Sequence, residues 1–521
     1  MSSKFVAAIT SGLLLALPFL FPILFPLAWI FLISLFWLLQ RERAWRQAFF
    51  FGWLTGGIAN VLGFYWLDYT IRVFGGFPYG VSELIFLVFA AYGALPLALV
   101  ALLVRLCGFG PLYLYPALFW VAIEFWFPLL FPWHLANSQS QFLALIQTAD
   151  MVGPYGTSLL LVWLSTMLYA AISPRDRETK NYLRGAVVLS ALLIGALWYG
   201  HWRLGGMEAA VTAARPLKVA AVQGNIDIRR KWGVVYLESN LKSYQELTKK
   251  VDEADLVIWP ETAVEVWLPE NIGRLPSEIL PSLPLKTAFI FGARSFRGNP
   301  AMTHVQAFNS AFLADARGLV SGFYHKQILL AFGEYLPFAA VLSKLPGMPP
   351  LGDGFASGDG PRTLDLPNGV RAAPLVCYED LMPALARRFV AEKGANLLVN
   401  LTNDAWFGNT AAPWQHLRLA QWRAIETRRY LVRVTNTGLT SVINAKGEIV
   451  ETLPLFSPGV LTAKVALLEG ETPYVRFGDW FAWAATLLAL AAFAFRLVQL
   501  FKPSRSGDLD KIGDRPKGDA R

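Results

Sequence analysis

Long apolar runs fill roughly the first two hundred residues, and they restrict the fold of this chain more than any other feature. Several approach the roughly 20 residues that a helix needs to cross the hydrocarbon core of a bilayer. Hydrophobic residues make up 55% of the sequence and charged residues 16%, which is too apolar for a soluble protein. The runs cover residues 5–21, 23–39, 49–67, 81–104, 112–130, 157–172 and 186–199, and a last one covers 480–500. Residues 1–204 are therefore predicted to form a multi-pass α-helical membrane bundle of about seven spans.

The first two runs are rich in proline, with Pro18, Pro22 and Pro26, so they form either a tight hairpin or one kinked element. A cleaved signal peptide is the competing interpretation of this segment. No small-residue cleavage site follows it, and apolar sequence simply continues, so we expect a retained span.

Positive charge alternates between the loops, and this alternation predicts the orientation of the chain. The basic loops contain Lys4; Arg41, Arg43 and Arg46; Arg105; and Arg175, Arg177, Lys180 and Arg184. The opposite loops hold only Arg72 and, from 131 to 156, no Lys or Arg. Because cytoplasmic loops carry the excess of positive charge, we expect a cytoplasmic N-terminus and eight spans with both ends inside. Segment 478–500 is then the final transmembrane helix, and 501–521 a disordered cytoplasmic tail.

Between residues 216 and 471 the composition changes to that of a soluble domain, which this topology places outside the cytoplasm. Short β-rich runs alternate here with helical patterns, as is typical of an α/β domain. We expect strands at 217–222, 256–259, 288–292, 311–314, 373–376, 397–401 and 431–435, and helices at 235–251, 381–392 and 414–429.

Charge and cysteine content exclude several classes of partner. The net charge of +9 lies largely in loops beside apolar spans, where it fits orientation and contact with membrane lipids. No basic stripe is interleaved with aromatic residues, so nucleic acid is not expected as a partner. Two cysteines far apart in the sequence and five scattered histidines give no disulfide framework and no metal-ligand spacing.

Cys377 is the first candidate for chemistry, because it lies where an apolar strand meets a predicted helix. The unpaired N–H groups and the positive dipole end of a helix favour the thiolate form of such a cysteine. The alternative is that Cys377 fills an apolar core, as most free cysteines do.

Glu261 and Lys326 follow other apolar runs in the same domain. A carboxylate, a lysine and a cysteine are what acyl transfer through a thioester requires. The base takes the thiol proton, the sulfur attacks a carbonyl, and a cation stabilises the oxyanion. An isolated exposed glutamate or lysine is usually a solvated surface group. Glu261, Lys326 and Cys377 all follow strands of one α/β domain, however, and this arrangement favours an active site.

The segments around these residues resemble those of a known superfamily. Trp-Pro-Glu at 259–261, His-Lys at 325–326 and Leu-Val-Cys-Tyr-Glu at 375–379 resemble the Glu-Lys-Cys triad of the nitrilase superfamily, which has an αββα sandwich fold. A nitrilase-like domain between a membrane bundle and a final span resembles the apolipoprotein N-acyltransferase family. Further matches are 222–226, Lys231-Trp232, 332–337, 400–408, Pro132-Trp133 and Ser138-Gln139.

The resemblance implies a role for each matching residue. Cys377 corresponds to the nucleophile, Glu261 to the general base and Lys326 to the group that holds the oxyanion. The supporting positions are Glu334, a second carboxylate, and Tyr378, Glu379 and Trp232, which place the substrate. The alternatives are an interfacial anchor for Trp232 and, compatible with the family role, a helix N-terminal carboxylate for Glu379. Asn403, Asp404 and Trp406 are expected to be structural or to line a pocket, and Asp380 makes the Cys377 turn unusually acidic.

The resemblance also implies the substrates. The acyl donor is a membrane phospholipid, the acceptor is the α-amino group of a diacylglyceryl-cysteine at the N-terminus of a lipoprotein, and no cofactor or metal is needed. The implied location is the bacterial inner membrane, with the catalytic domain on the periplasmic side. The apolar segments 266–269 and 338–350 are candidates for a lipid entrance, with ordinary loop packing as the alternative.

Two other functions remain open at this point. A membrane-tethered nitrilase-type amidase would use the same triad but give water access to the thioester. A transporter with an external binding domain would rely on intramembrane charge, which is sparse here, with Glu124 the main example.

The predicted orientation can be tested by labelling. A single cysteine introduced on the surface of the domain 216–471 should react with a membrane-impermeant maleimide added outside intact spheroplasts. A cysteine in the tail 501–521 is the matched control and should react only after lysis. The reverse pattern would overturn the orientation.

Overall fold

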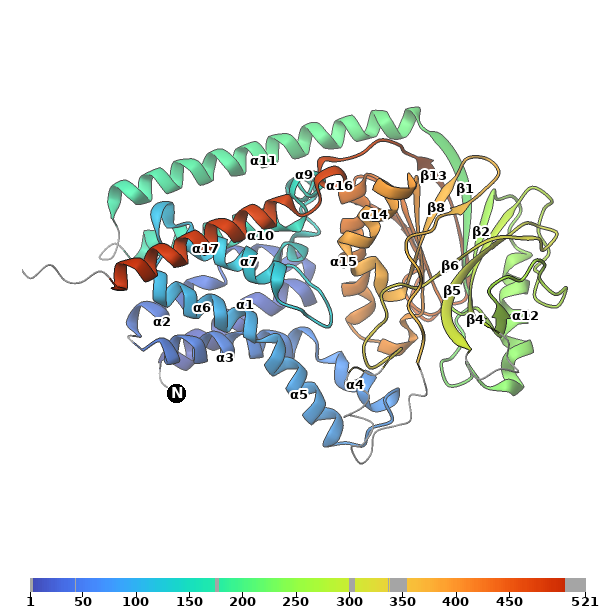
Figure 1. The fold of residues 1–521 in the computed structure, drawn as a ribbon, viewed down its shortest axis with the longest axis horizontal. Coiled ribbons are helices and arrows are strands. Elements are labelled where there is room, and N and C mark those ends of the chain that lie inside the picture. The colour runs from blue at the N-terminus through green and yellow to red at the C-terminus, as the bar shows by residue number, and fades with distance from the viewer. Residues whose placement is uncertain are drawn as a thin grey trace, which may run out of the picture.

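The computed structural model describes residues 3–42, 44–173, 178–298, 305–335, 337 and 354–501. A helical bundle forms one end of an elongated molecule and an α/β domain the other, with helix α15 between them (Figure 1). The expected fold class, a multi-pass helical bundle followed by a nitrilase-like α/β sandwich, is confirmed. The expected segment 338–350 and the tail beyond Phe501 lie outside the described residues.

Six helical stretches among the described residues are long and apolar enough to cross a membrane. Helices α3 and α4, bent by 63° at the break between them, make a seventh if they are counted as one span. The expected span at 112–130 contains only α7, a helix of 12 residues, so length alone supports six or seven of the eight expected spans.

The first two runs are separate elements packed against each other, a hairpin rather than one kinked helix. The bundle elements are α1 (Ser3–Leu20), η1 (Pro22–Trp29), α2 (Leu32–Arg41), α3 (Trp45–Gly63), α4 (Trp66–Val73), α5 (Val81–Gly93), α6 (Leu95–Cys107), α7 (Tyr115–Trp126), η3 (Leu135–Gln139), α8 (Leu143–Ile146), α9 (Ala149–Val152), α10 (Pro154–Ile172) and α17 (Trp480–Phe501).

Helix α11 (Thr179–Ala213) joins the bundle to the α/β domain without a linker. The sequence predicted a span at 186–199, but the helix continues to Ala213 and strand β1 begins at Arg215. Its 35 residues extend for about 52 Å, which exceeds the hydrocarbon core of about 30 Å. The helix is therefore longer than a single span requires, and its last turns lead directly into the α/β domain.

Two β-sheets pack face to face in the α/β domain. The first has the strand order β13-β1-β2-β4-β5-β6, with β3 paired to β4, and the second has the order β12-β11-β10-β9-β8-β7. Their facing side chains share one apolar core, which contains Val219 and Leu313 from the first sheet and Leu375 and Val432 from the second. The strands are β1 (Arg215–Gln223), β2 (Leu256–Ile258), β3 (Val264–Pro269), β4 (Ala288–Arg297), β5 (Gln306–Ala314), β6 (Val320–His325), β7 (Leu364–Asp365), β8 (Arg371–Val376), β9 (Leu397–Thr402), β10 (Leu431–Thr435), β11 (Ser441–Ile443), β12 (Ile449–Thr452) and β13 (Gly459–Leu467).

Helices cover both outer faces and complete an αββα sandwich (Figure 1). Helix α12 (Leu237–Thr248) lies outside the first sheet, and α14 (Pro383–Lys393) and α15 (Ala412–Thr427) lie outside the second. Every strand that the apolar runs predicted is present. Segment 266–269, expected as a loop, belongs to strand β3, although Val266 and Trp267 remain exposed.

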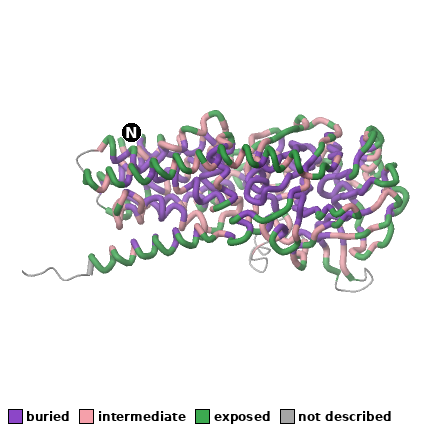
Figure 2. Tube along the Cα trace, turned by 90° about the horizontal axis from the view of Figure 1, so that it is seen from above, coloured by how far each residue is buried: buried purple, intermediate pink, exposed green. Residues whose placement is uncertain are grey.

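Buried polar contacts fix the α/β domain to the bundle. Arg428, just after α15, forms an ion pair of 2.7 Å with Asp150 in α9, and Arg203 of α11 donates to the same carboxylate oxygen at 2.8 Å. Trp422 of α15 donates to the Ser140 hydroxyl at 3.1 Å. Figure 2 shows buried segments in both halves of the molecule. Because unpaired buried charges are costly, these pairs restrict how the two halves can be placed.

Candidate active site

Cys377 occupies a sharp turn between strand β8 and the short helix η6 (Cys377–Leu381), as the sequence predicted. Its φ of 54° lies in the left-handed region, which is costly for a residue with a side chain. The Asn400 amide of the neighbouring strand β9 donates to the carbonyl oxygens of Leu375 and Cys377, both at 3.0 Å. These bonds hold the strained turn and leave Cys377 half-buried.

Glu261 lies in the turn after strand β2, close against strand β4. A Cβ on Gly292 of β4 would lie 2.5 Å from the Pro260 carbonyl oxygen, so only glycine permits this approach. The Glu261 carboxylate is buried, and its Oε1 accepts a hydrogen bond of 2.7 Å from Asn309. Its Oε2 is buried and has no hydrogen-bond partner among the described residues. One carboxylate oxygen is therefore held while the other is free to accept a proton.

Lys326 directly follows strand β6, and its ammonium is buried against Glu334 with an Nζ–Oε2 distance of 2.6 Å. Asn309 links the Lys326–Glu334 pair to Glu261. Its side-chain amide donates to Glu334 at 2.9 Å as well as to Glu261. The Lys326 amide also donates to the Asn309 carbonyl at 2.9 Å. Sequence reasoning missed Asn309. Its only signal is a polar residue inside the apolar run of β5.

Burial and charge set the protonation of these groups. Burial raises the pKa of the Cys377 thiol, the Glu261 carboxylate raises it further, and the Lys326 ammonium only partly offsets them. This raised pKa contradicts the expected stabilisation of the thiolate, because burial and the Glu261 charge together outweigh the attraction of the Lys326 ammonium. Burial also raises the pKa of Glu261, against the opposing charge of Lys326. Burial alone would lower the pKa of Lys326, but Glu334, Cys377 and Glu261 raise it, so the lysine stays charged.

Glu379 connects the turn at Cys377 to the turn that follows Lys326. One carboxylate oxygen accepts from the backbone N–H groups of Gln327 at 2.7 Å and Ile328 at 3.1 Å, and from the Tyr324 hydroxyl at 2.9 Å. The other oxygen accepts from the Val376 N–H at 2.8 Å. Burial raises the pKa of Glu379 to about 7. The side chain has no exposed surface, so its contacts are those of a positioning residue.

Tyr378 faces the membrane bundle. Its hydroxyl donates to the Leu130 carbonyl at 2.7 Å, and its ring meets Phe131 edge-on at 6.3 Å. Residues 130–131 follow helix α7, so Tyr378, the residue after Cys377, is in direct contact with the helical bundle.

Trp232 lies at the rim of the domain with a φ of 78°. The Arg294 guanidinium lies between the indoles of Trp232 and Trp267, at 4.6 and 4.8 Å from the ring centres. The backbone N–H of Trp232 donates to the Glu265 carboxylate at 3.0 Å. This stack keeps a large aromatic surface exposed.

Asp380 and Asp404 belong to a buried ion cluster next to the turn at Cys377. His416 joins Asp380 at 2.7 Å and Asp404 at 3.1 Å, and Arg433 pairs with Asp404 at 3.0 Å. Burial opposes protonation, but the two aspartates raise the pKa of His416 to about 9. The negative charge of Asp380 is thus neutralised within the cluster, and Asp404 is structural, as expected. No group of three His, Cys, Asp or Glu residues in the described ranges has a metal-binding arrangement.

The αββα sandwich of the α/β domain matches a known class of protein domain. The family model described as Carbon-nitrogen hydrolase matches residues 218–472. An amidase from Nesterenkonia sp. of known structure is 19% identical, with a TM-score of 0.33, over 51% of this chain and 95% of that one.

The comparisons extend to the membrane bundle. The model described as Apolipoprotein N-acyltransferase N-terminal domain matches residues 11–167. The apolipoprotein N-acyltransferase of Geobacter metallireducens is 38% identical over 94% of this chain and 95% of its own length. That of Bdellovibrio bacteriovorus is 34% identical, over 93% and 92%. The chain belongs to the apolipoprotein N-acyltransferase family.

The positioning role of Glu379 predicts a local effect of mutation. In Glu379→Gln, an amide N–H₂ replaces one acceptor and leaves buried backbone N–H groups unpaired. Hydrogen exchange of the segments 324–328 and 376–379 should become about tenfold faster or more. Glu392→Gln on the exposed side of α14 is the control and should leave both segments unchanged. Hydrogen exchange as slow in Glu379→Gln as in the wild type would contradict the positioning role of Glu379.

Proposed function

We propose that this protein, an N-acyltransferase of lipoprotein maturation, carries a fatty acyl chain on Cys377 from a membrane phospholipid to the α-amino group of an N-terminal diacylglyceryl-cysteine. One observation above all supports the proposal. The thiol of the strained Cys377 turn interacts electrostatically with two buried groups, the Glu261 carboxylate, which has one unpartnered oxygen, and the Lys326 ammonium. The relatives named apolipoprotein N-acyltransferase span both halves of the chain, so the chemistry and the membrane bundle belong together.

In the first half-reaction, Glu261 Oε2 takes the proton of the Cys377 thiol while the sulfur attacks the ester carbonyl of the phospholipid. The raised thiol pKa means that this base is required, because little thiolate is present beforehand. The new oxyanion lies beside the Lys326 ammonium, which Glu334 keeps in place. The ester C–O bond then breaks, and Glu261 returns the proton to the departing lysophospholipid alkoxide. The acyl chain remains as a thioester.

In the second half-reaction, the lipoprotein amine attacks the thioester carbonyl as a neutral group. Glu261 accepts a proton from the attacking nitrogen, the C–S bond breaks, and the proton returns to the Cys377 sulfur. The result is an amide and a regenerated thiol. Asn309 is proposed as a positioning residue in both steps, since it bonds to both Glu261 and Glu334.

Membrane substrates account for the surroundings of the site better than a small amide does. Tyr378 joins the nucleophile turn to residues 130–131 of the bundle, and Trp232 and Trp267 expose aromatic surface at the rim. We assign substrate placement to Tyr378 and Trp232 on this ground. A membrane-tethered amidase would use the same triad, but no feature of the site favours it. The sparse charge in the spans does not favour a transporter either.

The protein is embedded in a membrane, and we assign it to the bacterial inner membrane with the α/β domain on the periplasmic side. The basic loops at Arg41–Arg46 and Arg175–Arg184 support this orientation through the positive-inside rule. The proposed domains are 1–204, 216–471, 478–500 and 501–521, with α11 continuing across the first boundary.

The acyl carrier can be tested by trapping. Purified protein incubated with phospholipid labelled in its acyl chain should gain one hydroxylamine-sensitive adduct, identified by mass spectrometry at Cys377. Cys377→Ala should gain none, because the thioester cannot form. Cys107→Ser is the control and should label as wild type does. Equal labelling of Cys377→Ala, or no labelling of wild type, would refute the proposal.

The position of Glu261 predicts the pH dependence of transfer. Burial raises its pKa, so activity should be lost on acidification above the usual glutamate value of about 4.3. The Asn309 N–H stabilises the ionised carboxylate, so Asn309→Ala should raise the pKa and move the acid limb of kcat/KM upward by about one pH unit. Asn368→Ala, in the turn between β7 and β8, is the control. An unshifted limb in Asn309→Ala would count against Glu261 as the base.

A further inference from the structure

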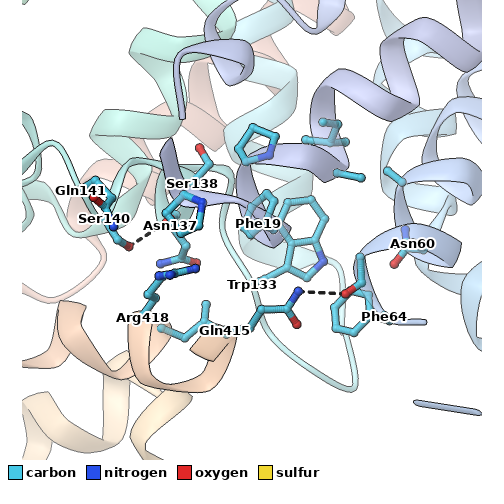
Figure 3. A pocket seen from close by; sticks show the side chains of 17 residues that line it. Phe19, Asn60, Phe64, Trp133, Asn137, Ser138, Ser140, Gln141, Gln415 and Arg418 are labelled. Atoms are coloured by element: carbon cyan, nitrogen blue, oxygen red, sulfur yellow. Dashed lines mark hydrogen bonds between the residues drawn. The ribbon is translucent and has the colours of Figure 1, made fainter. Parts of the chain in front are cut away.

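A pocket lies where the bundle meets the α/β domain, and none of Glu261, Lys326 and Cys377 lines it. It is formed by the ends of α1 and α3, the segment around η3, and α15 (Figure 3). Its lining includes Leu15, Phe19, Phe64 and Trp133 on the apolar side, and Asn137, Gln141 and Arg418 on the polar side.

The apolar side of the pocket is continuous with a surface suited to lipid. Pro22 lines the pocket, and its neighbours Phe21 and Ile23 are 55% and 82% exposed at the tip between α1 and η1. Exposed aliphatic and aromatic side chains at the end of a membrane helix pack against acyl chains. A hydrocarbon chain can therefore lie against this tip while its polar end enters the pocket.

Arg418 is the unusual residue of the polar side. Other buried arginines nearby are paired, Arg428 with Asp150, Arg423 with Glu426 and Arg433 with Asp404. Within the part of the chain that the structure describes, Arg418 has no hydrogen bond and no ion pair. Burial lowers its pKa to about 10, with no carboxylate to offset the effect. A half-buried guanidinium without an anion is an incomplete site.

The helix that carries Arg418 is fixed against the bundle next to the pocket. Gln415, one turn earlier on α15, accepts from Trp66 at 2.9 Å and donates to the Gly63 carbonyl at 3.0 Å, which fixes this helix on the bundle. Figure 3 shows the Arg418 side chain extending from α15 toward Asn137. The Asn137 side-chain oxygen accepts from the His134 N–H, which leaves its N–H₂ group available as a donor.

We propose that this pocket binds a glycerophospholipid, with its phosphodiester on Arg418 and an acyl chain against α1 and α3. Guanidinium and amide N–H groups donate to phosphate oxygens in the planar, two-point geometry that arginine favours. Binding also depends on contact between an acyl chain and the apolar side of the pocket, so a water-soluble phosphate without an acyl chain should not bind. This binding involves no covalent step and does not depend on the proposed acyl transfer.

The test is native mass spectrometry of the full chain in detergent, titrated with phosphatidylglycerol. Wild type should retain a tightly bound lipid, and Arg418→Gln should bind it about tenfold or more weakly. Arg418→Lys, which keeps the charge but not the two-point geometry, should fall between them. Arg317→Gln, on an exposed turn of the α/β domain, is the matched control and should bind as wild type does.

Two further ligands, tested on the wild-type protein, separate the contribution of the phosphate from that of the acyl chains. Diacylglycerol with the same chains lacks the phosphate, and glycerol 3-phosphate lacks the chains, so neither should replace the bound lipid at equal concentration. Equal affinity for diacylglycerol, displacement by glycerol 3-phosphate, or wild-type binding by Arg418→Gln would overturn the proposal. Cys377→Ala should bind phosphatidylglycerol normally, so failure of acyl transfer and failure of this site give different results.

Discussion

The Glu379 carboxylate sets the geometry on which the rest of the site depends. The cysteine turn follows a strand of one sheet and the lysine turn follows a strand of the other, and neither local sequence can fix their separation. Glu379 bonds to backbone N–H groups of both turns, at Val376 and at Gln327 and Ile328. A carboxylate buried with full hydrogen bonding stabilises one arrangement strongly, because the same oxygens without partners would be costly.

The electrostatics of the site follow from burial. Burial disfavours an ionised thiol and an ionised carboxylate side by side, and it raises the pKa of both Cys377 and Glu261. The Lys326–Glu334 pair supplies a permanent cation nearby without adding net charge. In the proposed acyl carrier a thiol with a raised pKa is an advantage, since a thiol is less easily oxidised than a thiolate.

The junction between the two halves is polar although both halves have apolar cores. Buried pairs such as Arg428 with Asp150, and hydrogen bonds from Trp422 and Tyr378 to the bundle, define a single way to join them. Directional contacts of this kind place the nucleophile turn relative to the membrane, which nonspecific apolar packing would leave undetermined. At the same junction, Arg418 has no anionic partner among the described residues.

The sequence alone determined the features that depend on local pattern. Apolar length predicted the spans, and alternating runs predicted an α/β domain. Short motifs that resemble the nitrilase superfamily implied the αββα sandwich and identified Glu261, Lys326 and Cys377 at strand ends. The tertiary structure decided what depends on residues distant in the chain. It showed Asn309 between the carboxylates, turned Glu379 inward, and continued α11 without a break into β1. It also reversed the predicted ionisation of Cys377, because burial and the nearby Glu261 arise only when separate strands come together.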